Sequence, residues 1–393
     1  MRITEIKTFV VYAYRTNFVF VRVDTDEGLS GVGEGTLEYK EHALLGAIED
    51  IRRTLVGRDP GRIEELTGLL YRDSYWRTGP VLQSAVSAIE MALWDIKGKY
   101  YGAPVYDLLG GKVREEIRMY ANGWFAGART PEEFAQKAEE AVALGVTALK
   151  WDPFGKAYMT LGREEFTRAL ACVEAVHGAV KGRADLLIEG HGRFDVATSI
   201  RIARALAPFE PMFFEEPVPP DSMDALTQVH EKSPVPIAAG ERLFTLYDFA
   251  RLLERGCVDF VQPDMSHCGG ISAVAKIAAM AQARYISLAP HNPSGPVANA
   301  AALQLAGCLS GFRILEIMLT DVAWRRELTD ETVTFREGAV AIPDRPGLGV
   351  ELREANFSRY PFQPIDLRHY KGSLTDIRPK EGTCLYMEGM GAE

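Results

Sequence analysis

The sequence has no long hydrophobic run, and none of its apolar stretches approaches the ~20 residues that a membrane-spanning helix requires. The N-terminal run alternates polar and apolar residues as a strand does and soon reaches Arg15, unlike a secretory signal peptide. Cysteine is scarce, with five widely spaced residues and no C-x-x-C pair, which disfavours a disulfide framework and a zinc site. These absences predict a soluble, cytoplasmic protein with reduced thiols.

Clusters of basic residues are lacking as well. The formal net charge is -10, and no group of Lys and Arg residues offsets it locally. Such a surface repels phosphate backbones and anionic lipids, so we expect neither nucleic acid nor a membrane as a partner. The composition is otherwise that of a globular protein, with 47% hydrophobic and 25% charged residues. A chain of 393 residues exceeds what one small core fills, which predicts two folding units.

The N-terminal part of the sequence predicts an α+β unit of ~110 residues. Short strands with turn residues between them fill residues 2–36, and residues 18–23 alternate apolar and polar side chains. Helical periodicity follows in residues 41–55, 63–71 and 84–101, where apolar residues recur at helical spacing.

A different pattern begins at Val113, where short apolar strands alternate with amphipathic helices. This alternation is typical of βα units around a parallel sheet. The eight expected strands span residues 118–122, 147–150, 185–189, 212–215, 236–239, 259–262, 285–289 and 313–317. Eight strand-helix repeats in roughly 220 residues match the size of a (β/α)8 barrel, whose active sites lie at the carboxyl ends of the strands.

Nearly every expected barrel strand ends in an ionisable residue. In chain order these residues are Lys150, Glu189, Glu215, Glu241, Asp264, His291 and Glu316. Three glutamates lie on consecutive strands, so a barrel would bring their carboxylates together, and three close anions need a cation. Ligands that are all oxygen favour a hard ion such as Mg²⁺. A single glutamate at a strand end is more often solvated or paired with a loop cation, but three in phase favour the metal site.

Asp264 and His291 are expected to meet because they end neighbouring strands. A carboxylate bonded to one imidazole nitrogen fixes the tautomer and raises the basicity of the other nitrogen, as a general base requires. The alternative is a structural histidine satisfied within a loop.

Two further pairs of polar residues are separated by one position. His191 follows Glu189 by two residues and would face the metal pocket, provided that the strand does not end by Gly190. Lys150 and Asp152 share this spacing, and an ordinary ion pair between them is the alternative reading.

Four motifs, in this order and spacing, resemble the enolase superfamily, in particular its mandelate racemase subgroup: Glu215-Glu-Pro217, Gly240-Glu-Arg242, Gln262-Pro-Asp264 and Pro290-His291. The resemblance implies an α/β fold in which an N-terminal α+β capping domain, residues 1–113, covers a modified TIM (β/α)8-type barrel, residues 114–335. It also implies that residues 336–393 pack back on the cap and that loops near residues 14–18 close on the substrate. Homo-oligomers are common among such proteins, so a homo-oligomer is expected.

Within that subgroup, the sequence is most similar to gluconate and galactonate dehydratases. The likeness lies in Tyr120-Ala-Asn-Gly-Trp124, Leu149-Lys-Trp-Asp-Pro-Phe-Gly155 and Ile188-Glu-Gly-His-Gly-Arg193. It implies a hydro-lyase with one Mg²⁺ per site and no organic cofactor, which converts a small acid sugar to a 2-keto-3-deoxy acid.

The same resemblance assigns roles by position. Glu189, Glu215 and Glu241 would bind Mg²⁺. His291 with Asp264 would remove the C2 proton, and His191 would protonate the departing 3-hydroxyl. Lys150 and Glu316 would contact the substrate carboxylate. The choice of sugar is expected to depend on the loops around Arg15 and on residues such as Asn122 and Asp152, whose contacts the sequence does not define.

Two alternatives stay open. Racemases of the subgroup commonly carry Lys-x-Lys where this chain has Lys150-Trp-Asp152, so the second lysine is missing. Racemisation needs an acid and a base on opposite faces of one carbon, whereas dehydration needs a base at C2 and an acid at C3. The sequence therefore favours a dehydratase, with a 2-hydroxy acid racemase or epimerase using Lys150 as one alternative. A non-catalytic protein that keeps the fold is the other.

Overall fold

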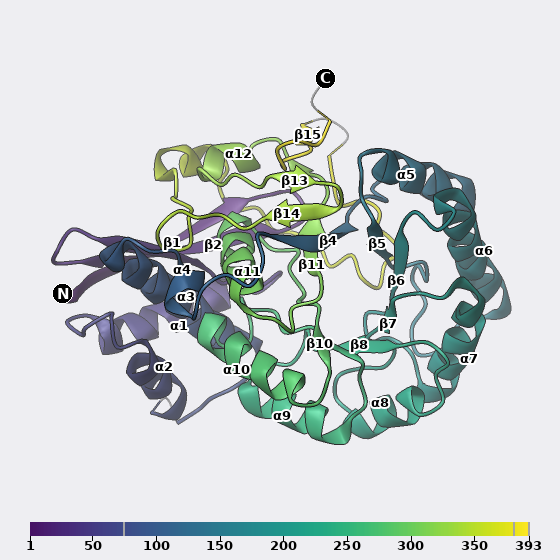
Figure 1. Cartoon of the computed structure of the whole chain (residues 1–393), viewed down its shortest axis with the longest axis horizontal. Helices are drawn as coiled ribbons and strands as arrows, with labels where there is room; N and C mark the ends of the chain where they lie inside the picture. The colour runs from purple at the N-terminus through teal and green to yellow at the C-terminus, as the bar shows by residue number, and fades with distance from the viewer. Residues whose placement is uncertain (74, 380–381, 392–393) are drawn as a thin grey trace.

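The N-terminal unit packs a three-stranded antiparallel sheet, in the order β1-β2-β3, against helices (Figure 1). The structure is a computed structural model that describes residues 1–73, 75–379 and 382–391. The elements of this unit are β1 (Ile3–Tyr12), β2 (Asn17–Thr25), β3 (Ser30–Glu34), α1 (Glu41–Leu55), α2 (Ile63–Arg72), α3 (Pro80–Tyr101) and α4 (Val105–Leu108). They form the α+β unit that the sequence predicts.

Helix α3 is buried on nearly every side because it lies between this sheet and the second unit. Ala88 and Ile89 belong to the core of the N-terminal unit, whereas Met91 joins the core of the second unit. Strand β3 approaches α3 so closely that a Cβ atom on Gly33 would lie 1.8 Å from the backbone oxygen of Ala88. Glycine is therefore required at this strand position by backbone approach.

In the part of the chain that the structure describes, the second unit contains eight parallel strands arranged in a ring (Figure 1). Strands β4 to β10 pair in chain order, β11 pairs with β4, and an isolated parallel bridge between Leu288 and Phe312 joins β10 to the segment before β11. The strands are β4 (Glu116–Asn122), β5 (Ala148–Trp151), β6 (Asp185–Glu189), β7 (Phe213–Glu215), β8 (Ile237–Ala239), β9 (Phe260–Val261), β10 (Ser287–Leu288) and β11 (Leu315–Met318). Each overlaps one expected strand, and the expected fold class is confirmed.

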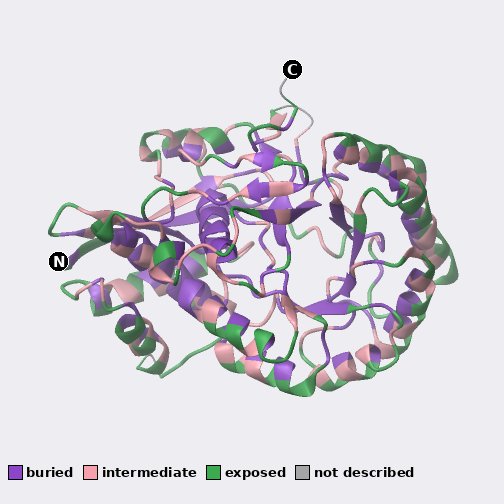
Figure 2. Ribbon diagram, viewed as in Figure 1, coloured by how far each residue is buried: buried purple, intermediate pink, exposed green. Residues whose placement is uncertain are grey.

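Helices cover the outside of the ring, with buried residues toward the strands and exposed residues outward (Figure 2). They are α5 (Pro131–Ala143), α6 (Arg163–Val180), α7 (Val196–Leu206), η1 (Ala207–Phe209), α8 (Met223–His230), α9 (Leu246–Arg255), α10 (Gly270–Gln282) and α11 (Pro296–Cys308). The eighth repeat differs from the expectation, because β11 leads into β12 (Asp321–Val322) and the four-residue α12 (Arg325–Leu328). None of the described helices combines the length and apolar character needed to cross a membrane.

Two buried carboxylates fasten the N-terminal unit to the last two helices of the ring. Glu90 of α3 accepts hydrogen bonds from the backbone N–H groups of Ile271 and Ser272, at the start of α10. Glu34 of β3 accepts from Gly295, Val297 and Ala298, at the start of α11. Both helices begin after a glycine, which has no side chain to cap them, so the neighbouring unit supplies the caps.

The C-terminal segment contacts both units. Strands β13 (Phe335–Arg336) and β14 (Ala339–Ala341) extend the sheet beyond β4, η2 (Glu354–Arg359) follows, and β15 (Thr383–Cys384) pairs with β12. The ring of Phe357 packs 5.3 Å from Phe9 and 5.6 Å from Phe20 of the N-terminal sheet. The boundaries expected at residues 113 and 335 stay predictions.

Candidate active site

A cavity of about 420 Å³ lies where the carboxyl ends of the barrel strands face the N-terminal unit. Three parts of the chain line it: the strand-end loops, residues 15, 36–39 and 80 of the N-terminal unit, and residues 367–377. Of the residues predicted from the sequence, those that line it are Lys150, Glu189, Glu241, His191, His291, Arg15, Asn122 and Asp152. Glu215, Asp264 and Glu316 are buried next to these lining residues.

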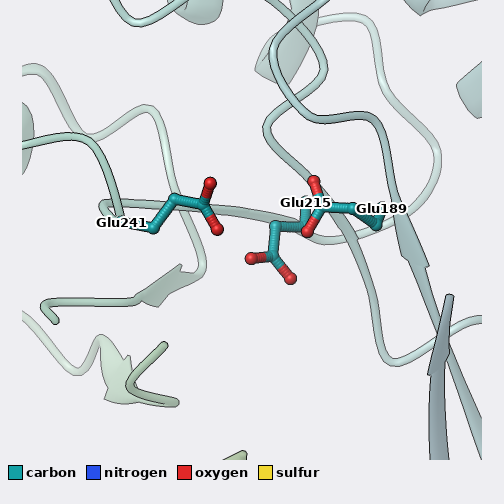
Figure 3. A group of neighbouring side chains, drawn as sticks. All are labelled: Glu189, Glu215 and Glu241. Atoms are coloured by element: carbon teal, nitrogen blue, oxygen red, sulfur yellow. The ribbon is translucent and has the colours of Figure 1, made fainter. Parts of the chain in front are cut away.

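Three glutamates converge beside this cavity (Figure 3). One carboxylate oxygen from each of Glu189, Glu215 and Glu241 lies within 4.8 Å of the other two. Glu189 and Glu215 are register partners on adjacent parallel strands, which places their side chains next to each other. Glu241 follows Gly240, whose φ of 142° and close contact with the backbone of Gln262 leave no room for a side chain.

The chemistry of this cluster fits a hard divalent cation. Burial and then the nearby charge of Glu189 raise the pKa of Glu215 well above its usual range, although the charge of Lys150 lowers it, as expected for crowded carboxylates. The Oε2 atom of Glu215 is buried and accepts no hydrogen bond from any described residue. Buried carboxylate oxygens are normally paired or bound to metal. The donor set is all oxygen, which suits Mg²⁺ or a similar ion.

Lys150 supplies the positive charge next to this cluster. Its Nζ atom lies 2.8 Å from Oε1 of Glu215, 3.0 Å from Oε2 of Glu189 and 3.5 Å from Oε1 of Glu316. Burial alone would lower the pKa of Lys150, but these carboxylates outweigh it and raise the pKa well above its usual value. Lys150 therefore carries its charge at the edge of the cavity, and it does not pair with Asp152 among the described contacts.

His291 and Asp264 form the expected pair. The Nδ1 atom of His291 lies 2.7 Å from Oδ2 of Asp264, and its Nε2 atom lies 3.2 Å from Oε2 of Glu241. Asp264 also accepts a hydrogen bond of 2.7 Å from the backbone N–H of Ser266. Burial opposes the charged imidazole, but Glu241 and Asp264 outweigh it and raise the pKa of His291 to about 10.

His191 reaches the cavity by a route that the sequence reasoning did not foresee. Strand β6 ends at Glu189, and His191 has a left-handed φ of 48°, so the argument from an extended strand is wrong. A turn directs the side chain instead, because the backbone N–H of His191 donates to Oε1 of Glu189 at 2.6 Å. In the resulting position, Nδ1 of His191 lies 2.6 Å from Oδ2 of Asp152.

Arg193 holds the second histidine pair together. It is fully buried, and its Nη2 atom donates to both oxygens of Asp152, at 2.7 and 2.6 Å. Its other nitrogens donate to the carbonyl oxygens of Gly190 and Gly155, at 3.1 and 2.7 Å. Asp152 is therefore engaged by His191 and Arg193, and the structure shows it as the carboxylate that orients His191.

The other residues expected at the substrate already have protein partners. Glu316 accepts from Nδ2 of Asn122 at 2.8 Å and from the backbone N–H of Asn292 at 2.9 Å. Arg15 is buried and donates from Nη1 to Glu38 at 2.9 Å, while its Nε and Nη2 atoms have no hydrogen-bond partner among the described residues. Direct contact of Glu316, Asn122 or Arg15 with substrate stays a prediction.

The sequence reasoning missed the contribution of the C-terminal segment to the cavity. The side chains involved belong to Leu367, Arg368, His369, Tyr370, Leu374 and Ile377. The ring of His369 lies 4.9 Å from that of His191, edge to face. No periodicity or motif marks this segment, so its position could not be inferred from the residues alone.

Comparisons with known proteins identify the family. A model of the mandelate racemase / muconate lactonizing enzyme N-terminal domain matches residues 4–110, and a model of the enolase C-terminal domain-like family matches residues 133–356. The chain belongs to the mandelate racemase and muconate lactonizing enzyme family. This membership confirms the resemblance drawn from the strand-end motifs.

Relatives in this family cover nearly the whole chain. A D-galactonate dehydratase of Variovorax paradoxus (strain S110) is 36% identical over 96% of this chain and 100% of its own length. A D-gluconate dehydratase of Thermoproteus tenax is 35% identical over 93% of this chain and 75% of its own length.

Solved structures of the family have the same fold. The mandelate racemase/muconate lactonizing enzyme from Jannaschia sp. CCS1 superposes with a TM-score of 0.87 at 32% identity, covering 94% of this chain and 100% of its own. A member of the enolase superfamily from Salmonella Typhimurium gives 0.87 at 30% identity, covering 92% and 98%.

Proposed function

We propose that this protein is a Mg²⁺-dependent acid-sugar dehydratase, which converts an aldonic acid to a 2-keto-3-deoxy acid. One observation carries the proposal: two separate histidine-aspartate pairs face one cavity, one next to Glu189 and the other next to Glu241 of the three-carboxylate cluster. Dehydration needs a base at C2 and an acid at C3, and two independent imidazoles fit those two tasks. The galactonate and gluconate dehydratases among its relatives support the same reaction class.

The reaction proceeds by proton transfer at both ends of one carbon-carbon bond. His291, in its neutral form, removes the hydrogen from C2 of the substrate, and the electron pair moves toward the carboxylate as an enediolate. His191 then donates a proton to the 3-hydroxyl, the C3–O bond breaks, and water leaves as the electron pair forms a C2–C3 double bond. The resulting enol loses the proton of its 2-hydroxyl group, takes up a proton at C3 and becomes the 2-keto-3-deoxy acid.

The surroundings of the two histidines match these roles. Asp264 has no cationic side chain within ion-pair distance among the described residues except the histidines that it contacts. Asp152, in contrast, is shared between His191 and the guanidinium of Arg193. Because Arg193 neutralises part of its charge, Asp152 holds a proton on His191 less firmly than Asp264 holds one on His291. His191 is therefore the better proton donor and His291 the better acceptor.

Glu189, Glu215 and Glu241 would hold the metal ion. When bound, Mg²⁺ supplies positive charge that stabilises the developing negative charge on the substrate carboxylate. Lys150 adds a fixed ammonium on the same side of the cavity. Calorimetric titration with Mg²⁺ should give one site per chain, and Glu215→Gln should abolish it while leaving the fold intact by circular dichroism. A wild-type chain that binds no divalent ion would contradict the assignment.

A racemase fits this arrangement less well. Racemisation would require Lys150 to give and take a proton on the face of C2 opposite His291. Its ammonium is instead surrounded by three carboxylates that keep it charged. Lys150 is therefore suited to a fixed electrostatic role rather than to repeated proton transfer.

The test is a panel of acid sugars incubated with the purified protein and Mg²⁺ in D₂O. We expect a 2-keto-3-deoxy product from at least one aldonic acid. Inversion at C2 with deuterium uptake and no loss of water would indicate a racemase, and no reaction with any acid sugar would favour a non-catalytic protein. A cytoplasmic location and a homo-oligomeric state stay predictions, which fractionation and light scattering can test.

A further inference from the structure

The C-terminal segment forms a fixed wall of the cavity. The carbonyl oxygen of Thr375 accepts a hydrogen bond of 2.7 Å from the backbone N–H of Gly127, in the loop after β4. On the other side, the hydroxyl of Tyr14 lies 3.3 Å from Oδ1 of Asp376, and Nη2 of Arg368 donates to the Tyr14 carbonyl oxygen at 3.2 Å. The segment is thereby tied to both the barrel and the N-terminal unit.

His369 is the residue of this wall that stands beside the proposed acid. Its ring meets the His191 ring edge to face, with 4.9 Å between centroids and an angle of 77°. Its backbone carbonyl oxygen lies 3.4 Å from Nη1 of Arg193, the same guanidinium that holds Asp152. Arg193 therefore holds both the pair of His191 and Asp152 and the backbone of His369.

The ring nitrogens of His369 are available to a ligand. They make no hydrogen bond to any described residue, although the ring is partly buried and lines the cavity. Burial and then the charge of His191 lower the pKa of His369, which keeps the ring neutral. A neutral imidazole presents one N–H donor and one acceptor nitrogen, which is the complement of an alcohol.

We propose that His369 is a substrate-contacting, specificity-determining residue, which binds the hydroxyl at C4 of the acid sugar. The inference rests on the proposed dehydratase function, because that function places the 3-hydroxyl at His191. His369 is the neighbour of His191 on the side of the C-terminal wall, and C2 must face His291. The substituent that remains within reach of His369 is therefore the one on C4.

This contact narrows the substrate class. An alcohol at C4 can both donate to and accept from the imidazole, whereas a carboxylate at that carbon only accepts. Four-carbon diacids would leave the acceptor nitrogen of His369 unpaired, and buried unpaired polar groups weaken binding. The expected substrates are thus aldonic acids with a free 4-hydroxyl.

The experiment compares a substrate from the acid-sugar panel with its 4-deoxy counterpart. For the wild-type chain, kcat/KM should fall about 10-fold or more when the 4-hydroxyl is removed. His369→Phe keeps a ring of similar size but cannot hydrogen-bond. It should lose about 10-fold on the parent substrate, mostly in KM, and should discriminate between the two substrates less than about 3-fold. His369→Gln, which can donate and accept, should recover part of the discrimination.

Control variants test the role of His369 independently of the proposed dehydratase function. His177→Phe changes an exposed histidine on α6, outside the cavity, and should behave as the wild type does. Deuterium exchange at C2 should persist in His369→Phe, which shows that the metal and base are intact. If His369→Phe does not fold, His369→Leu takes its place with the same readout.

Two results would overturn the inference in different ways. Suppose that the wild type dehydrates an acid sugar and that His369→Phe discriminates against the 4-deoxy compound as strongly as the wild type does. His369 then does not bind the 4-hydroxyl, while the dehydratase function stands. If the wild type dehydrates no acid sugar, the proposed function fails and the assignment of His369 fails with it.

Discussion

The two histidine pairs at the cavity look alike but are supported by different parts of the chain. His291 and Asp264 lie next to loops that the N-terminal unit holds. Ser84 of α3 contacts Nδ1 of His267 at 2.8 Å, and Ser87 of α3 accepts from the backbone N–H of Gly269 at 2.9 Å. His191 and Asp152 depend instead on Arg193 and, through it, on the C-terminal segment. The residues proposed to remove and to donate a proton therefore have separate structural supports.

The largest expected effect comes from disrupting the pair of His291 and Asp264, which is proposed to act as the general base. His291→Asn removes the imidazole that takes the C2 proton, so both C2 deuterium exchange and dehydration should fall about 1,000-fold or more. Binding of Mg²⁺ should persist, because the three glutamates are unchanged. Exchange measured by NMR in D₂O checks this. Retained exchange would move the base to another residue.

Removing the acid should separate the two reactions. His191→Asn is expected to lower dehydration about 100- to 1,000-fold while C2 exchange continues, because the enediolate still forms but the 3-hydroxyl cannot leave. Product formation and deuterium uptake are measured on the same sample. The matching control is His177→Asn on the outer face of α6. Loss of both reactions would withdraw the acid assignment from His191.

A smaller effect is expected from weakening the hydrogen bonds by which Arg193 holds Asp152, the partner of His191. Arg193→Lys keeps the positive charge but cannot reproduce the hydrogen bonds to Asp152, Gly155 and Gly190 together. Dehydration should fall about 10-fold, mostly in kcat, while C2 exchange changes less than about 3-fold. Arg201→Lys, on α7, is the control and should have no effect. Equal losses in both reactions would show that Arg193 acts on the fold as a whole.

The last expected effect concerns the contact of the N-terminal unit with α10, and it changes the stability of the fold rather than the rate of the reaction. Burial raises the pKa of Glu90 to about 7, against hydrogen bonds from Ser272, Ile271 and Trp94 that lower it. Because the folded pKa exceeds the usual 4.5, the contribution is complete below pH 4.5 and is lost as the pH rises through 7. The loss is at most about 3 kcal/mol.

Thermal unfolding between pH 5 and 8 measures this contribution. The Tm of the wild type should fall across that range relative to the Tm of Glu90→Gln, in which an uncharged amide replaces the acid. Glu64→Gln, at an exposed ion pair with Lys276, is the control. Parallel curves for the wild type and Glu90→Gln would show that Glu90 does not titrate in this range.

Much of the fold could be predicted because helix caps and the alternation of strands and helices are visible as regular patterns in the sequence. The helix at α5 begins with a capping box between Thr130 and Glu133 and a proline at its first turn, all visible in the sequence. All eight barrel strands were expected at nearly their observed positions, since short apolar runs alternate with amphipathic helices. The shortness of the eighth helix, the four-residue α12, was not foreseen, because the strand-helix alternation predicts a full helix in every repeat.

The site was predictable where residues at the ends of adjacent strands must lie close together in the fold. Parallel strands of a ring bring their carboxyl ends to one rim, so Glu189, Glu215 and Glu241 had to meet. The position of His191 was expected for a wrong reason, since a left-handed turn rather than an extended strand directs it. Its pairing with Asp152, and the role of Arg193 between them, depend on side-chain geometry that spacing alone does not define.

The sequence by itself determined the periodic features of this protein: the barrel repeat, the rim of ionisable groups, and the family to which the chain belongs. Each arises from local preferences of the backbone and from burial of apolar faces, which leave a regular trace in the order of residues. Only the tertiary structure decided which distant segments complete the site. The C-terminal wall with His369, and the carboxylates of Glu34 and Glu90 that cap helices of the neighbouring unit, are contacts between segments more than 170 residues apart. Such contacts depend on how whole units pack, and no local pattern records them.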